Sequence, residues 1–164
     1  MEGSSIRIPE YVQKLKPYKA GSQQGDKKKP KKMINLAANE NPLGPASKAI
    51  EAVRKAAWAM HRYPDPLTAE LSELTGNKYG IEADRLVFGS GSESLIMHAI
   101  YAFAEPNEEV LTGESTFVGI FVMTNKVGRK LKTVPMKDHG FDLDGILAAI
   151  TPKTRIIYLS NPNN

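Results

Sequence analysis

The spacing of apolar residues predicts helices in the part of the chain before Gly80. A first helix is predicted from Pro45, because apolar residues there recur at three- and four-residue intervals. Its apolar stripe consists of Ile50, Val53, Ala57 and Met60. The stretch "RYPDP" ends this helix, and a second is predicted with Asp65 as its N-cap and Pro66 at its first position. The second stripe consists of Leu67, Leu71 and Leu74.

After Gly80 the pattern changes to short apolar runs that alternate with helical spacing. Strands are predicted at 85–88, 110–112, 131–134 and 155–160. Helices are predicted at 94–103, 117–127 and 143–150. Strands that alternate with helices favour right-handed crossovers and a mostly parallel sheet covered on both faces. The expected fold class is therefore α/β with three layers.

The stretch "LVFGSGSESL" (86–95) passes from an apolar run into glycines and hydroxyls just before a predicted helix. Gly89 and Gly91 let the backbone turn tightly and approach a ligand. The helix is predicted to begin near Ser92–Glu93, so its unpaired N–H groups and positive dipole end face the turn. Together these features predict an anion site, with phosphate as the favoured ligand. The alternative, a turn that only caps the helix, stays open.

Two phosphate-binding motifs with more specific sequences can be compared with this turn. A P-loop requires a lysine after its second glycine, and none follows here, so that motif is excluded. The dinucleotide fingerprint requires a third Gly or Ala where Ser94 stands, while Glu114 offers a candidate ribose-binding acid. Such a fingerprint usually opens a domain, and more than 80 residues precede this one. It stays open as a competing hypothesis.

Composition narrows the class of protein. The chain has 164 residues and 41% hydrophobic content, enough for one packed core. It contains no cysteine, which excludes disulfides and thiolate metal sites, and His61, His98 and His139 lack metal-ligand spacing. No run of 18 apolar residues and no secretory signal are present. A cytoplasmic protein with no metal and no membrane partner is expected.

The net charge of +4 is unevenly distributed. Residues 1–33 carry 9 Lys/Arg and 3 Asp/Glu (+6), whereas residues 34–164 carry 13 and 15 (−2). A lysine run of this kind can bind nucleic acid. However, Gly21, Gly25 and Pro30 interrupt it, and few apolar residues accompany it, so a solvated loop is the favoured interpretation. No nucleic-acid partner is expected.

Several motifs occur together in one order: "LAANENPLGP" (36–45), "HRYPDP" (61–66), "GSGSESL" (89–95), "STF" (115–117) and "SNPNN" (160–164). In order and spacing they resemble the class I/II aminotransferases of fold type I, which use pyridoxal 5′-phosphate, and most of all the histidinol-phosphate aminotransferase branch. The resemblance implies the three-layer, mostly parallel large domain of that family, incomplete here. It assigns residues 1–43 to an extended N-terminal arm and residues 44–164 to part of the cofactor-binding domain.

The resemblance also implies a set of cofactor contacts. Gly91, Ser92 and Glu93 match the turn that holds the cofactor phosphate. Phe117 matches the aromatic residue that stacks on the pyridine ring, and Asn164 matches the asparagine that hydrogen-bonds the pyridoxal 3′-oxygen. On residue type alone, Phe117 also fits a core aromatic at a helix start, and "NPNN" also fits a turn after a strand.

Further positions are implied at the substrate side. Tyr63 matches a tyrosine that contacts the cofactor phosphate of the neighbouring subunit, so a homodimer is implied; an ordinary packed residue at a helix end is the alternative. The substrate-binding arm is matched by Tyr18, Asn39, Glu40 and Asn41. The family's glycine loop usually reads G-N-G-S-D-E, and Ser90, Glu93 and Ser94 depart from it. These departures leave the cofactor assignment intact but weaken the choice of branch.

The resemblance also limits what this chain is expected to do alone. The family's pyridinium-binding Asp, its Schiff-base Lys and its carboxylate-binding Arg are expected beyond Asn164, and none of the 16 lysines matches the catalytic position. The chain is thus expected to be an N-terminal fragment without catalytic residues, inactive alone. The implied reaction, in histidine biosynthesis, is transamination between histidinol phosphate and 2-oxoglutarate. Threonine-phosphate decarboxylation, aromatic amino-acid transamination and a non-catalytic nucleotide-binding α/β module stay as alternatives.

Overall fold

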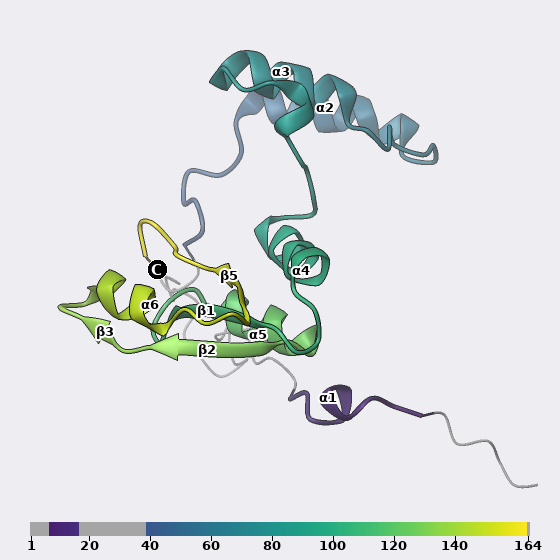
Figure 1. Cartoon of the computed structure of the whole chain (residues 1–164). Coiled ribbons are helices and arrows are strands. Elements are labelled where there is room, and N and C mark those ends of the chain that lie inside the picture. Colours follow the sequence, from purple (N-terminus) through teal and green to yellow (C-terminus); the bar gives the residue numbers. More distant parts are fainter. Residues whose placement is uncertain (1–6, 17–38, 164) are drawn as a thin grey trace, which may run out of the picture. The chain divides into compact units, whose positions relative to one another are not determined.

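The computed structural model describes residues 7–16 and 39–163, which fall into two compact units (Figure 1). The first, here called the sheet unit, comprises residues 1–17 and 88–164. The second, the helical unit, comprises residues 18–87. The predicted division into an arm up to residue 43 and a domain from residue 44 stays a prediction.

A parallel sheet of three strands forms the centre of the sheet unit. Its strands are β1 (Glu109–Gly113), β2 (Lys130–Val134) and β5 (Thr154–Ile157), in the order β2-β1-β5. Val110 in β1 lies opposite Leu131 in β2 and Ile156 in β5. The short strands β3 (Met136–Lys137) and β4 (Gly140–Phe141) form an antiparallel hairpin.

Helices cover both faces of this sheet. The helices of the unit are α1 (Glu10–Gln13), α4 (Ser92–Phe103), α5 (Val118–Lys126) and α6 (Leu143–Ala149). Successive strand residues point to opposite faces, and Val110 and Leu111 of β1 accordingly belong to different clusters. Val110 packs with Ile100 of α4 and with Ile120 and Met123 of α5. Leu111 packs with Val134 of β2 and Ile146 of α6. The predicted three-layer α/β fold is confirmed.

The helical unit consists of α2 (Ser47–Ala56), the 3₁₀ helix η1 (Ala57–Ala59), α3 (Ala69–Tyr79) and the 3₁₀ helix η2 (Ala83–Arg85). Over residues 39–87, the buried positions are Ser72 and Gly76 of α3. A Cβ atom at Gly76 would lie 2.5 Å from the carbonyl oxygen of Ile81. Glycine at this position therefore lets the chain after α3 fold back closely onto the helix.

The predicted strand at 85–88 is wrong. Residues 83–85 form η2, where Arg85 and Leu86 donate backbone hydrogen bonds to Glu82 and Ala83, three residues earlier. Residues 86–89 have no regular structure. A strand requires a ladder partner, and an apolar run by itself does not supply one.

The predicted start of the second helix is also wrong. The Asp65 carboxylate accepts hydrogen bonds from the backbone N–H groups of Leu67 (3.0 Å) and Ala69 (2.8 Å). Asp65 thus closes a turn before the helix, and α3 begins only at Ala69, with Thr68 as its N-cap. The last predicted strand, 155–160, is shorter than expected and ends at Ile157. The first predicted helix, from Pro45 to the stretch at 62–66, is shorter than expected, because its α-helical part ends at Ala56 and the 3₁₀ helix η1 follows to Ala59. The remaining predicted strands and helices agree with the structure to within about two residues at either end.

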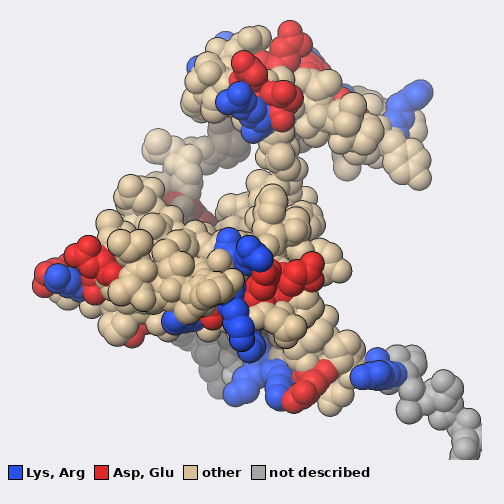
Figure 2. Space-filling view, viewed as in Figure 1, with Lys and Arg blue, Asp and Glu red and all other residues tan. Residues whose placement is uncertain are grey.

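On the face of the molecule seen in Figure 2, basic and acidic side chains are interspersed over the described residues. The lysine-rich run at 27–32 lies outside those residues, as do Tyr18 and Asn164 among the predicted site residues.

Candidate functional site

The turn from Gly89 to Ser92, immediately before α4, is built by two glycines that serve different purposes. The N–H of Gly91 donates to the carbonyl of Gly89 at 2.8 Å, which closes a tight turn. A Cβ atom at Gly89 would lie 2.9 Å from both Leu95 Cδ2 and Ser94 Oγ, so this glycine allows close packing against α4. Gly91 has φ +86°, and a Cβ atom there would meet nothing within 4 Å beyond its chain neighbours. Glycine is therefore needed at position 91 because of this positive φ, and the space beside the start of α4 is open.

The N-terminus of α4 has donors to offer to an anion. Gly91 is the N-cap, and no side chain of the described residues caps the helix there. The first N–H groups of a helix have no intrahelical partner and carry the positive end of the dipole. The exposed hydroxyl of Ser92 adds a further donor. Ser94, which departs from the family's loop, donates to the Gly91 carbonyl at 2.8 Å and so braces the turn. This donor set suits a phosphate group.

The glycine turn lies toward the carboxyl ends of the strands. Helix α4 packs against the sheet, and residues 104–108 join its end to the start of β1. A helix that packs on a sheet and is joined to the next strand by so short a connection runs antiparallel to that strand. The N-terminus of α4 therefore points to the edge of the sheet where β1 and β5 end. Ligands of open α/β sheets bind at this edge.

The loops that follow β1 and β5 are joined at the same edge. The Oγ1 of Thr116 donates to the Oδ1 of Asn163 at 2.7 Å. The Nδ2 of Asn163 donates in turn to the backbone carbonyl of Ser115 at 3.0 Å. One side chain after β5 thus holds two adjacent residues of the loop after β1. Sequence reasoning missed Thr116 and Asn163, although each is the immediate neighbour of a predicted site residue, Phe117 and Asn164.

Phe117 is the N-cap of α5 and is half-buried. Its ring lies against Gly119 in the first turn of the helix: a Cβ atom at Gly119 would be 2.2 Å from the ring Cε1. Because Gly119 has no side chain, there is room for the ring at this place. Phe117 is therefore positioned by its own helix and by the loop that precedes it.

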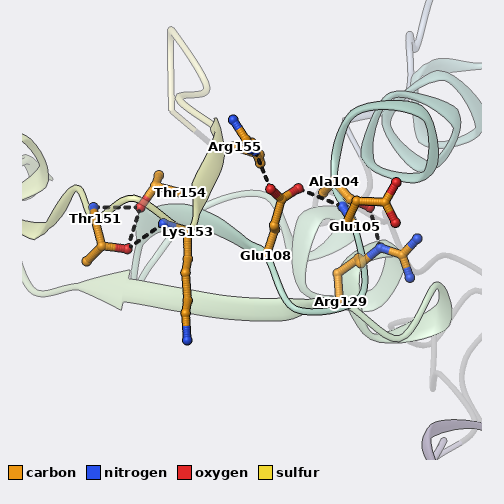
Figure 3. A network of polar contacts seen from close by, with 8 residues as sticks. All are labelled: Ala104, Glu105, Glu108, Arg129, Thr151, Lys153, Thr154 and Arg155. Atoms are coloured by element: carbon orange, nitrogen blue, oxygen red, sulfur yellow. Dashed lines mark hydrogen bonds and ion pairs between the residues drawn. The ribbon is translucent and has the colours of Figure 1, made fainter.

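The polar network in Figure 3 lies at the opposite, amino-terminal edge of the sheet. Glu108 accepts a hydrogen bond from the backbone N–H of Glu105 at 2.8 Å and pairs with Arg155. The Glu105 N–H, followed by Arg155, lowers the pKa of the Glu108 carboxyl. Arg129 donates to the carbonyls of Ala104 and Val127. Each of these charged side chains is thus bound to another group of the protein, which indicates a structural role.

Glu109, the first residue of β1, forms a second group of hydrogen bonds at the amino-terminal edge of the sheet. Its Oε1 accepts from the hydroxyls of Thr154 (2.8 Å) and Thr151 (2.9 Å). The Thr154 hydroxyl, followed by that of Thr151, lowers the pKa of the Glu109 carboxyl. These bonds join the beginnings of β1 and β5 where the register of their pairing shifts.

The predicted substrate-side residues that the structure describes lie in the helical unit. Tyr63 is fully exposed, and Asn39, Glu40 and Asn41 are exposed as well. Asn41 accepts from the N–H of Leu43 at 3.0 Å and donates to the carbonyl of Gly44 at 3.3 Å, so it stabilises its own turn. Their predicted contacts with substrate or with a neighbouring subunit stay predictions.

Within residues 7–16 and 39–163, no helix is long and apolar enough to cross a membrane. The same residues contain no group of three His, Cys, Asp or Glu side chains placed to hold a metal ion.

Comparison with known proteins identifies the family. The chain is 38% identical over 157 residues to a histidinol-phosphate aminotransferase from Sphingopyxis alaskensis, covering 94% of this chain and 42% of the relative. It is 39% identical over 133 residues to one from Paramagnetospirillum magneticum, covering 81% and 37%. A crystal structure of histidinol-phosphate aminotransferase from Sinorhizobium meliloti in complex with pyridoxal-5′-phosphate matches with a TM-score of 0.73 and 30% identity, covering 77% of this chain and 35% of that one.

The chain therefore spans about two fifths of the length of these two curated relatives. The sequence profile of aminotransferase class I and II matches residues 31–164, which is most of the chain and includes the glycine turn, Phe117 and Asn163. On this match, the chain belongs to the aminotransferase class I and II family.

Proposed function

We propose that this chain forms the phosphate- and ring-binding part of a pyridoxal-phosphate site in an aminotransferase that acts on histidinol phosphate and 2-oxoglutarate. The observation that carries the proposal is the N-terminus of α4, which follows the N-cap Gly91 and has no side-chain cap. The names of the relatives support histidinol phosphate as one substrate, and the complex from Sinorhizobium meliloti supports the cofactor.

Each predicted cofactor contact has a physical task in this proposal. The backbone N–H groups at Gly91, Ser92 and Glu93 hold the phosphate dianion, because the helix dipole favours negative charge there. The Phe117 ring presents a flat apolar surface to the pyridine ring. Asn164 donates to the 3′-oxygen. The cofactor, when bound, supplies the aldehyde that carries the amino group and the electron-poor ring that stabilises negative charge on the substrate.

The proposal extends to the assembly and the substrate. Tyr63 contacts the cofactor phosphate of a second copy of the protein, which makes the active form a homodimer. Tyr18, Asn39, Glu40 and Asn41 contribute to recognition of the phosphorylated substrate. We place the complete protein in the cytoplasm.

Binding of pyridoxamine 5′-phosphate to the chain, measured by isothermal titration calorimetry, tests the cofactor site. This form of the cofactor has no aldehyde and does not react with the 16 lysines of the chain. We expect saturable binding to one site, weakened about tenfold or more in Gly91→Ala, because a Cβ at φ +86° strains the turn. Gly80→Ala is the matched control: its φ is +68° and its surroundings are equally open, but it is the C-cap of α3.

Equal affinity in the chain and in Gly91→Ala would contradict this site. Binding of AMP in preference to pyridoxamine 5′-phosphate would favour the nucleotide-binding module instead. In the complete protein, amino-group transfer from histidinol phosphate to 2-oxoglutarate is expected to exceed transfer from aromatic amino acids. Greater decarboxylation of threonine phosphate would identify the related decarboxylase.

A further inference from the structure

The side chain of Asn163 makes two hydrogen bonds to residues far away in the sequence. It accepts from Thr116 Oγ1 at 2.7 Å and donates to the Ser115 carbonyl at 3.0 Å, across 47 and 48 residues. An asparagine amide has one acceptor oxygen and two donor hydrogens. Asn163 accepts with its oxygen from Thr116 and donates with its nitrogen to Ser115. These two contacts fix both the orientation of the loop after β1 and its distance from Asn163.

The loop that Asn163 holds leads directly into Phe117. The residue after Thr116 is the N-cap of α5, and its carbonyl accepts from the Ile120 N–H at 3.2 Å. The ring is confined on the helix side by Gly119. The remaining freedom of Phe117 therefore lies in the backbone that precedes it. That backbone is the part that Asn163 binds.

We infer that Asn163 is a positioning residue of the cofactor site, which sets the place of the Phe117 ring by holding Ser115 and Thr116. The inference rests on the proposed function, since it assigns Phe117 to a cofactor ring. Asn163 touches no part of the cofactor in this role. Its effect on binding is transmitted through the loop after β1.

The role predicts a difference between two probes. Pyridoxamine 5′-phosphate uses both the α4 N-terminus and the Phe117 ring, whereas inorganic phosphate uses the α4 N-terminus alone. Asn163→Ala removes both hydrogen bonds and is expected to weaken pyridoxamine 5′-phosphate about tenfold, the effect of one or two lost hydrogen bonds. The affinity for inorganic phosphate is expected to stay within about twofold of the unchanged chain.

Three further variants make the test specific. Thr116→Val removes one of the two hydrogen bonds at nearly constant shape and is expected to show about half of the effect on a logarithmic scale. Asn107→Ala is the matched control, because Asn107 is an exposed asparagine in the loop before β1 and takes no part in this contact. In a Phe117→Leu background, Asn163→Ala is expected to have no additional effect, because the ring through which it acts is gone.

Each outcome of these titrations bears on a stated claim. Equal loss of both probes in Asn163→Ala would overturn the positioning role and leave a merely structural one. A full effect of Asn163→Ala in the Phe117→Leu background would also overturn it. If the unchanged chain binds pyridoxamine 5′-phosphate and Asn163→Ala binds it with the same affinity, the inference is overturned and the proposed function stands. Failure of the unchanged chain to bind pyridoxamine 5′-phosphate would overturn both.

Discussion

In the sheet unit, the side chains of Val110, Leu111 and Ile120 have no exposed surface, whereas in the helical unit Trp58 and Leu67 are 88% and 79% exposed. Both parts of the sequence carry apolar residues at the spacing of their elements. The strand β1 becomes buried because strands from both sides and helices on both faces pack on it. Helix α2 has an apolar stripe and no buried residue. An apolar pattern thus predicts which face an element offers, while burial depends on partners that come from elsewhere.

Replacing one leucine in each unit tests this difference directly. Leu111→Ala is expected to lower the free energy of unfolding by about 3 kcal/mol, because it leaves a cavity in the core between β1 and α6. Leu67→Ala removes the same atoms from an exposed position and is expected to change it by less than about 0.5 kcal/mol. Urea denaturation followed by circular dichroism measures both. A large loss in Leu67→Ala would break the comparison, because it would mean that Leu67 is covered in solution.

The same distinction between local pattern and distant partners decides which parts of the fold could be read from the sequence. The strands around Val110 and Leu131 were predictable, because apolar runs between turn residues mark buried parallel strands. The run at 85–88 has a similar composition, but a strand also needs a neighbour to pair with, and local sequence does not specify one. Asp65 was recognised as a residue that accepts backbone N–H groups. Local pattern could not show that it closes a separate turn before α3.

The candidate site was predictable only where its chemistry is local. The glycine turn and the start of α4 lie within a few residues, so their spacing alone predicts an anion site. The contact of Asn163 with Thr116 joins residues 47 positions apart and depends on β1 and β5 being neighbours in the sheet. That adjacency is a property of the topology. The assignment of the ligand came from the motif resemblance, which carries information that spacing does not.

Gly76→Ala extends the comparison of the two units to the helical unit, because it tests whether that unit has specific packing of its own. A Cβ there meets the Ile81 carbonyl at 2.5 Å, and a backbone oxygen does not move aside easily. We expect a loss of about 2 kcal/mol in unfolding free energy, typical of overpacking. Gly140→Ala in β4 is the control, since its nearest contact would be an ordinary 3.6 Å. If Gly76→Ala and Gly140→Ala behave alike, the turn after α3 is not held as the structure shows.

The smallest expected difference between the two units is in how much of the unfolding free energy is lost at acidic pH. The pKa of the Glu109 carboxyl in the sheet unit is lowered first by the Thr154 hydroxyl, and that of Asp65 in the helical unit first by the Ala69 N–H. A carboxyl whose pKa is lower in the folded state stabilises the fold above its ordinary pKa, and this contribution is lost as the pH falls through the lowered value. Glu109→Gln keeps an acceptor oxygen for both threonines but removes the charge, so its unfolding free energy should fall less steeply on acidification. Asp65→Asn is the matched variant in the helical unit. Because the Asp65 carboxylate is open to solvent, we expect Asp65→Asn to change the acid dependence of the unfolding free energy less than Glu109→Gln does. Urea denaturation from neutral to acidic pH measures both. An unchanged acid slope in Glu109→Gln would mean that the hydroxyls of Thr151 and Thr154 do not favour the ionised carboxylate.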